Sequence, residues 1–141
     1  GGGQKELTKM PKVYGFDTGF VSFCRGWEPL RAEDYGVLWE HVVLEYLQAH
    51  AGGRRIQYWR DAAGREIDFV IAYHRDRVDV VECKWAPDHF EPAALRTFRT
   101  YYPHGNNYLV CPVNEPGYFA RIAGLKIRVG NPGDWLTRAG A

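Results

Sequence analysis

Two carboxylates and a lysine interrupt otherwise apolar stretches near the middle of the chain. The first stretch covers residues 64–71 and contains Asp68, and the second covers residues 80–84 and contains Glu82 and Lys84. Carboxylate oxygens are the ligands that a hard cation such as Mg²⁺ prefers, and a lysine can stabilise developing negative charge. The pattern therefore indicates metal-assisted hydrolysis of a phosphodiester.

Both stretches have the composition of β-strands joined by a polar turn centred on Arg75. Such a hairpin places Asp68 directly opposite Glu82, with Cβ atoms about 4.5–5.5 Å apart. Side-chain alternation puts Glu82 and Lys84 on one face and separates the polar residues from their apolar neighbours, which are Ile67, Phe69, Ile71, Val81 and Cys83. Two carboxylates at this separation repel each other unless a cation bridges them.

The expected metal ligands are the carboxylates of Asp68 and Glu82 and the main-chain carbonyl of Cys83, around Mg²⁺ or Mn²⁺. Lys84 is expected to orient the attacking water or to stabilise the developing charge. Glu40 lies at the flank of the apolar stripe of a predicted helix, from which it could reach the same metal as an auxiliary ligand. Glu45, at the other flank, competes weakly for that role.

Other readings of these residues stay open. A glutamate two positions before a lysine on an exposed strand is often an ordinary ion pair, so a purely structural network is one alternative. A second alternative is a non-catalytic interaction or DNA-binding module that keeps a relic acidic site. Several side chains could contact phosphates or bases, or could equally be solvated or packed in the core, namely Arg60, Arg65, Arg96, Arg99, Tyr58, Trp59 and Trp85.

The elements that must position these residues follow from hydrophobic periodicity. Apolar residues at helical spacing predict a helix over 35–47 that is closed by Gly52-Gly53, and Asp88 followed by Pro92 predicts the start of a second helix. The remaining signals predict strands at 12–16, 55–60, 66–73, 78–84, 106–113 and 125–129, and a short helix at 20–24. The three strands at 55–60, 66–73 and 78–84 are expected to form an antiparallel meander. The fold class is α/β, in the order α-β-β-β-α-β, with a central mixed sheet flanked by helices.

Length and composition predict one domain without a strong overall field. The chain has 141 residues and a formal net charge of +1, so any contact with a polyanion must come from a local patch. Its three cysteines are odd in number and widely spaced, which favours reduced thiols and a cytoplasmic location. Residues 1–10 are expected to be a tag or linker and lead-in, and 11–141 the domain itself. The sequence has no apolar run long enough to span a membrane.

Five segments together resemble a known family; they are residues 12–19, 38–43, 58–60, 64–70 and 81–84. They are similar to the C-terminal domain of unknown function 4143 of bacterial and archaeal AAA+ ATPases, itself similar to the PD-(D/E)XK restriction-endonuclease-like superfamily. The resemblance implies a restriction-endonuclease-like core in which Glu40 matches the helix glutamate, Asp68 the strand aspartate, and Glu82 and Lys84 the E-x-K pair.

The same resemblance implies a Mg²⁺-dependent nuclease-like domain that processes DNA. It also implies a longer native protein, with an AAA+ ATPase module before Gln4. The present chain has no G-x-x-x-x-G-K-[ST] loop, so we do not expect this fragment to bind ATP.

Overall fold

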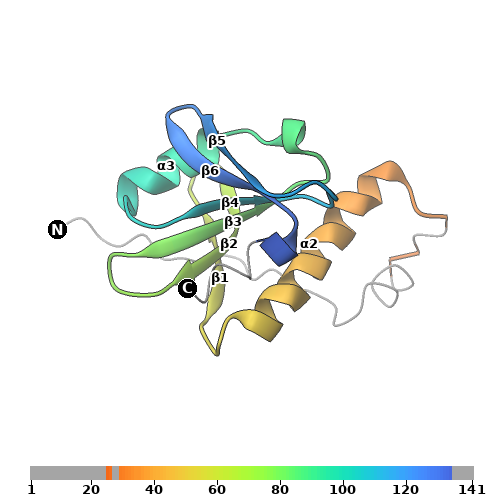
Figure 1. Ribbon diagram of the computed structural model, residues 1–141, viewed down its shortest axis with the longest axis horizontal. Coiled ribbons are helices and arrows are strands. Elements are labelled where there is room, and N and C mark those ends of the chain that lie inside the picture. Colours follow the sequence, from red (N-terminus) through yellow and green to blue (C-terminus); the bar gives the residue numbers. More distant parts are fainter. Residues whose placement is uncertain (1–24, 27–28, 135–141) are drawn as a thin grey trace.

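The computed structural model describes residues 25–26 and 29–134. The strand expected at 12–16 and the short helix expected at 20–24 lie outside the described residues. The described part forms a six-stranded mixed sheet with strand order β1-β2-β3-β4-β6-β5 (Figure 1). The strands are β1 Ile56–Arg60, β2 Glu66–Ala72, β3 Val78–Cys83, β4 Asn107–Val110, β5 Tyr118–Ile122 and β6 Leu125–Gly130.

The first described helix, α2, covers Ala32–His50 and begins three residues before the predicted start. Its N-terminus is stabilised by Asp34, whose carboxylate accepts a hydrogen bond of 2.8 Å from the backbone N–H of Arg31. The helix ends before Gly52 and Gly53, which both have positive φ. Val43 and Leu47 of α2 are buried against the sheet.

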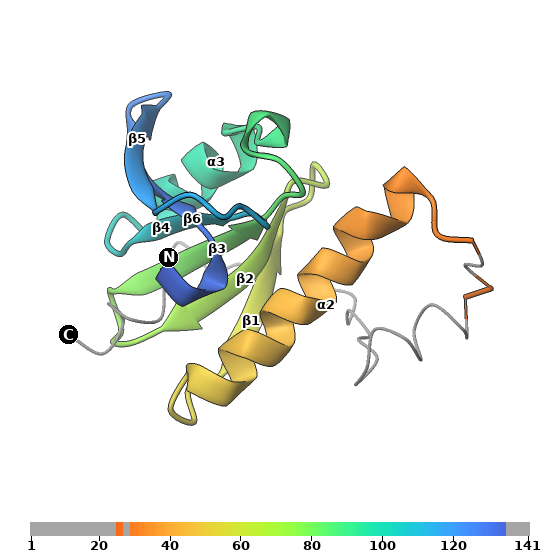
Figure 2. The same cartoon turned by 45° about the vertical axis from the view of Figure 1, so that its right-hand side comes forward.

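A second helix, α3, covers Ala93–Tyr101 and connects two parallel strands. It follows a short 3₁₀ helix at Pro87–His89, so the expected helix start at Asp88 is split into two pieces. The fixed φ of Pro92 suits the residue before the first turn of α3. Leu95 and Phe98 pack on the face of the sheet opposite to α2 (Figure 2).

The sheet combines two kinds of pairing, as the predicted mixed sheet requires. Strands β1, β2 and β3 form the expected antiparallel meander, and β3, β4 and β6 run parallel. Strand β5 was not predicted from the sequence; it pairs antiparallel with β6 at the edge of the sheet. Among the described residues, no helix has the length and apolar character needed to cross a membrane.

Candidate functional site

The candidate acidic residues meet where strands β2 and β3 stop pairing. Phe69 lies opposite Val81, which is the expected register, and one further step along it brings Asp68 beside Glu82. At that step the backbone N–H of Cys83 donates a hydrogen bond of 2.8 Å to Oδ2 of Asp68. A side chain therefore accepts the hydrogen bond at the end of this strand pair.

An irregularity in strand pairing sets the position of Asp68. Gln57 of β1 pairs with Val70 and Trp59 pairs with Ile67, so two β2 residues, Asp68 and Phe69, lie opposite a single residue of β1. This is a β-bulge, a feature that bends a strand and redirects a side chain. Regular alternation across this point was expected, and the bulge makes that expectation wrong.

The bulge separates the two faces of β2. Ile67 is buried in the cluster beneath α3, whereas Phe69 and Ile71 are buried in the cluster beneath α2. Asp68 lines a cavity of about 420 Å³ together with residues of α2, β1 and β2. Its carboxylate is thus reachable from the α2 side of the sheet.

The pKa of Asp68 responds to the other three predicted site residues, Glu40, Glu82 and Lys84. Burial raises the pKa of the Asp68 carboxyl above its ordinary value, and the negative charge of Glu40 raises it further. Hydrogen bonding to the Cys83 N–H and to the Glu82 side chain, and the positive charge of Lys84, act in the opposite direction. Glu40, Glu82 and Lys84 therefore all lie close enough to influence the protonation of Asp68.

The Asp68 and Glu82 side chains lie close together, because Glu82 acts on the pKa of Asp68, and Glu82 is only 5% exposed. Two acidic side chains this close repel each other when both are ionised, and a bound cation would offset that repulsion.

Cys83 presents its backbone, rather than its thiol, as a possible ligand. Lys84 N–H donates to Val110 of β4, so the alternating N–H and C=O groups of Cys83 face β2 and Asp68. Burial raises the pKa of the Cys83 thiol well above its usual range, and the charges of Asp68, Glu40 and Glu82 add to this effect. The thiol consequently stays neutral, which disfavours a thiolate ligand.

Helix α2 supplies Glu40 next to an anchored tryptophan. Trp39 Nε1–H donates a hydrogen bond of 2.9 Å to the carbonyl of Val110, which ties this part of α2 to β4. The Trp39 ring also meets Trp85 edge-on, with ring centroids 6.4 Å apart. Glu45, the competing helix acid, is exposed, whereas Glu40 is half-buried.

The donor set suits a hard divalent cation by its chemistry, because it contains carboxylates and a main-chain carbonyl. Within the described ranges, no three side chains of His, Cys, Asp or Glu are already arranged as a metal-ligand group. The Asp68 carboxylate accepts a hydrogen bond from the backbone N–H of Cys83. The residues present therefore fit a hard divalent cation by their chemistry alone.

One residue considered for phosphate contact has a different role. Arg99 is buried and donates five hydrogen bonds, all to the strand and loop around it. Burial lowers its pKa to about 10, and the charge of Asp79 partly offsets this. Arg99 is therefore a structural residue.

The other three arginines considered for phosphate contact are exposed. Arg60 forms an ion pair with Glu66, Arg65 forms one with Asp61, and Arg96 lies on α3.

The aromatic residues considered for base stacking also differ in their surroundings. Tyr58 and Trp59 are buried, which supports the core reading for both. Trp85 is 44% exposed and stacks on Tyr35, with ring centroids 5.0 Å apart.

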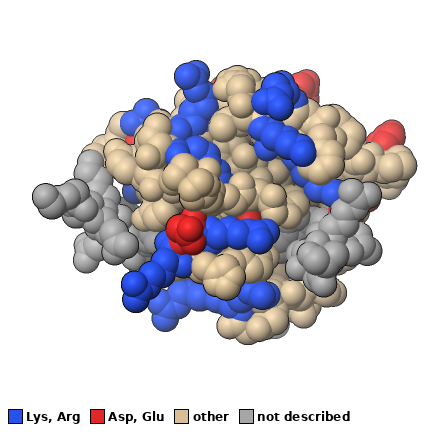
Figure 3. All heavy atoms as spheres, turned by 60° about the vertical axis from the view of Figure 1, so that its left-hand side comes forward, with Lys and Arg blue, Asp and Glu red and all other residues tan. Residues whose placement is uncertain are grey.

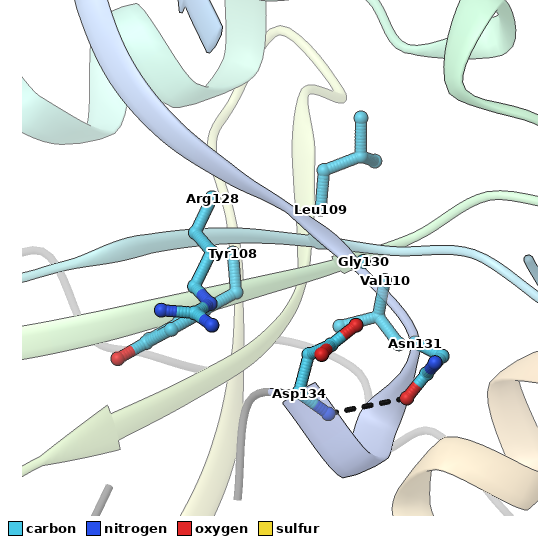
Figure 4. A pocket seen from close by; sticks show the side chains of 7 residues that line it. All are labelled: Tyr108, Leu109, Val110, Arg128, Gly130, Asn131 and Asp134. Carbon is cyan, nitrogen blue, oxygen red and sulfur yellow. Dashed lines mark hydrogen bonds between the residues drawn. The ribbon is translucent and has the colours of Figure 1, made fainter. Parts of the chain in front are cut away.

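A second depression lies near the ends of β4 and β6 and contains none of the predicted site residues (Figure 4). In it, the backbone N–H of Asp134 donates to the side-chain oxygen of Asn131 at 3.1 Å. The depression is too shallow to enclose a ligand.

Two features of the acidic site could not be predicted from the sequence. They are the bulge at Asp68 and the hydrogen bond from Trp39 to Val110, and neither leaves a signal in the local sequence pattern.

The fold and the site together define a mixed α/β domain with an acidic cluster at the point where β2 and β3 stop pairing. The chain belongs to the family described as a domain of unknown function (DUF4143), whose model matches residues 35–127 and thus more than half of the chain. Comparison with curated proteins finds no match.

Proposed function

We propose that this domain is a metal-dependent nuclease of the PD-(D/E)XK type, which hydrolyses phosphodiesters in DNA. The observation that carries the proposal is the position of the Asp68 carboxylate, which accepts the Cys83 N–H beside the buried Glu82 at the end of the β2–β3 pairing. Placing two buried acids side by side destabilises the fold through desolvation and charge repulsion, and a bound cation would offset this destabilisation.

In the proposed site, Asp68, Glu82 and the carbonyl of Cys83 hold Mg²⁺ or Mn²⁺, and Glu40 is an auxiliary ligand. The bound ion would polarise the scissile phosphate and lower the pKa of a bound water. Lys84 stabilises the negative charge that develops on the phosphate, or orients the attacking water. The half-buried position of Lys84 strengthens its electrostatic effect relative to a fully solvated amine.

The order of elements supports a restriction-endonuclease-like arrangement. A helix carrying Glu40 precedes the antiparallel strands carrying Asp68 and Glu82, and a further helix leads to the parallel strand β4. The resemblance of the sequence to the C-terminal domain of AAA+ ATPases suggests the partner and the substrate. In this proposal the partner is an AAA+ ATPase module in a longer chain, and the substrate is DNA.

Calorimetric titration with Mn²⁺ tests the ligand assignment. Asp68→Asn keeps a side-chain oxygen to accept the Cys83 N–H and removes the charge, so the variant should fold and should bind Mn²⁺ at least about tenfold more weakly. Asp76→Asn, in the exposed turn between β2 and β3, is the matched control and should bind as the wild type does. Equal affinity in wild type and Asp68→Asn would remove the metal assignment.

A second candidate is a non-catalytic interaction or DNA-binding module. It is favoured by the hydrogen bond from Cys83 to Asp68, because that bond gives the carboxylate a structural use without any metal. Glu82→Gln separates the two readings. The substitution should raise the metal-free melting temperature if the acidic contact is retained for catalysis, and should lower it if Glu82 stabilises the fold as a partner of Lys84.

A further inference from the structure

The hairpin of β5 and β6 presents three cations and an aromatic ring on one face of the sheet. Phe119 pairs with Arg128, and Arg121 pairs with Lys126. The alternate residues of these strands, Ala120, Ile122, Ile127 and Val129, belong to the core beneath α3. Because side chains alternate along a strand, the four paired residues lie on the other face.

Two of these cations, Lys126 and Arg128, lie next to the aromatic ring. Nζ of Lys126 lies 4.4 Å from the centroid of the Phe119 ring, and the guanidinium carbon of Arg128 lies 5.5 Å from it. Phe119 is nevertheless 57% exposed, so much of this large apolar side chain remains open to solvent. An exposed ring flanked by cations is suited to stack on a flat aromatic group that carries negative charge nearby.

The charges on this face are not balanced within the described part of the chain. Arg121 and Lys126 are direct cross-strand partners, and like charges in that position destabilise a sheet. No carboxylate among the described residues forms an ion pair with Arg121, Lys126 or Arg128. Arg128 is also 9% exposed, and its buried Nε has no hydrogen-bond partner among those residues. An anionic partner would balance the exposed charges of Arg121 and Lys126.

A second cation–aromatic group is arranged differently. Tyr73 at the end of β2 has Arg54 4.4 Å and Arg77 5.4 Å from its ring centroid. Arg77 already lies 3.9 Å from the carboxylate of Asp79, so its charge is partly balanced. Seen from the side of the β2–β3 turn, Lys and Arg side chains cover much more of the surface than Asp and Glu do (Figure 3). By contrast, no ion pair within the described ranges balances the cations of the β5–β6 face.

We propose that Phe119, Arg121, Lys126 and Arg128 form a binding surface for single-stranded nucleic acid, in which a base stacks on Phe119 and the cations contact phosphates. A single strand fits better than a duplex, because only unpaired bases expose the faces that stack on an aromatic side chain. The surface deepens the proposed function, on which its choice of partner rests, by naming the type of strand that the domain holds.

The test is fluorescence anisotropy of a labelled oligothymidylate strand in the presence of a chelator, so that no cleavage occurs. Phe119→Ala should weaken binding about tenfold, since stacking accounts for a large part of the affinity per base. Tyr118→Ala is the matched control, because Tyr118 is similarly exposed, at 51%, but precedes Phe119 and points to the opposite face. This control should change the affinity less than about twofold.

The cations are tested through salt dependence. The double variant Arg121→Gln/Lys126→Gln should reduce the slope of log affinity against log salt by about 1.4, which corresponds to two phosphate contacts on a single strand. Arg96→Gln, on α3 and beneath the other face of the sheet, should leave the slope unchanged.

Three results would overturn the proposal. They are an absence of binding, equal losses in Phe119→Ala and Tyr118→Ala, and a duplex or a polyglutamate peptide that binds as tightly as the single strand. The experiment is independent of catalysis. If the strand binds as expected but the wild type never cleaves DNA, the nuclease proposal fails and the binding surface stands.

Discussion

The backbone N–H of Cys83 donates a 2.8 Å hydrogen bond to Oδ2 of Asp68, across the point where β2 and β3 cease to pair. Asp68 therefore has two possible uses, as a cap for the strand end and as part of an acidic cluster with Glu82 and Glu40. Substitutions that keep the hydrogen bond while removing the charge distinguish these uses.

Asp68→Asn should stabilise the metal-free protein at neutral pH. Burial raises the pKa of Asp68, so the folded protein holds this proton more tightly than the unfolded chain does. The contribution of Asp68 to stability is therefore greatest below its ordinary pKa of about 4 and declines as pH rises through the raised pKa. Asn does not titrate, so the advantage of the variant should grow over that interval and then level off.

Urea denaturation of both proteins at a series of pH values from about 4 to about 8 measures this difference in the free energy of unfolding. A difference that stays constant with pH would show that the protonation of Asp68 does not differ between the folded and unfolded states.

Arg99→Met should be strongly destabilising. The substitution removes five hydrogen bonds, among them bonds to the carbonyls of Val78 and Asn106, and leaves buried acceptors without a donor. We expect a loss of about 3–5 kcal/mol in the free energy of unfolding. Arg96→Met, at an exposed position of the same helix, should stay within about 0.5 kcal/mol of the wild type. Similar melting curves for the two variants would show that the Arg99 network contributes little.

Gly105→Ala should prevent the normal approach of the loop before β4 to β3. Gly105 has a φ of +132°, and an added Cβ would overlap the carbonyl oxygen of Val78. The backbone must move, so thermal unfolding should occur at a much lower temperature than in the wild type. Gly124→Ala is the control, because its φ is +80° but no atom lies within 4 Å of the new Cβ. That variant should lose only about 1–3 kcal/mol through backbone strain.

Trp39→Phe should loosen the part of α2 that carries Glu40. The variant loses the 2.9 Å hydrogen bond to Val110, at a cost of about 1 kcal/mol, while an aromatic ring remains at the position. We expect a small decrease in melting temperature and a weaker Mn²⁺ affinity, with a smaller loss than in Asp68→Asn. Unchanged Mn²⁺ affinity in a folded Trp39→Phe protein would mean that the placement of Glu40 does not matter for the metal.

The sheet register could be predicted because a short polar turn leaves few ways to pair two strands. The turn around Arg75 and the apolar residues on either side are enough to place Phe69 opposite Val81. The bulge could not be predicted, since it depends on how β1 pairs with the other edge of β2 and on which core each side chain enters. The expected alternation at Ile67 was wrong for this reason.

Strand β5 was missed because its sequence lacks the usual signals. Its turn is Ala123-Gly124, and Ala123 adopts a φ of +51°, a conformation for which Asn or Gly is the common choice. Tyr118 and Phe119 are both exposed, so the strand also shows no clear alternation of buried and exposed residues. Only pairing with β6 defines it.

DNA cleavage is the most direct test of the central claim that Asp68, Glu82 and Lys84 form a hydrolytic site. Linear, circular and single-stranded DNA should be incubated with the domain in Mg²⁺ or Mn²⁺, beside Glu82→Gln and Lys84→Ala variants whose folding is checked by circular dichroism. The account predicts cleavage by the wild type that needs the metal and falls at least about a hundredfold in either variant. Equal cleavage by wild type and variants, or none by the folded wild type with either metal, would contradict it.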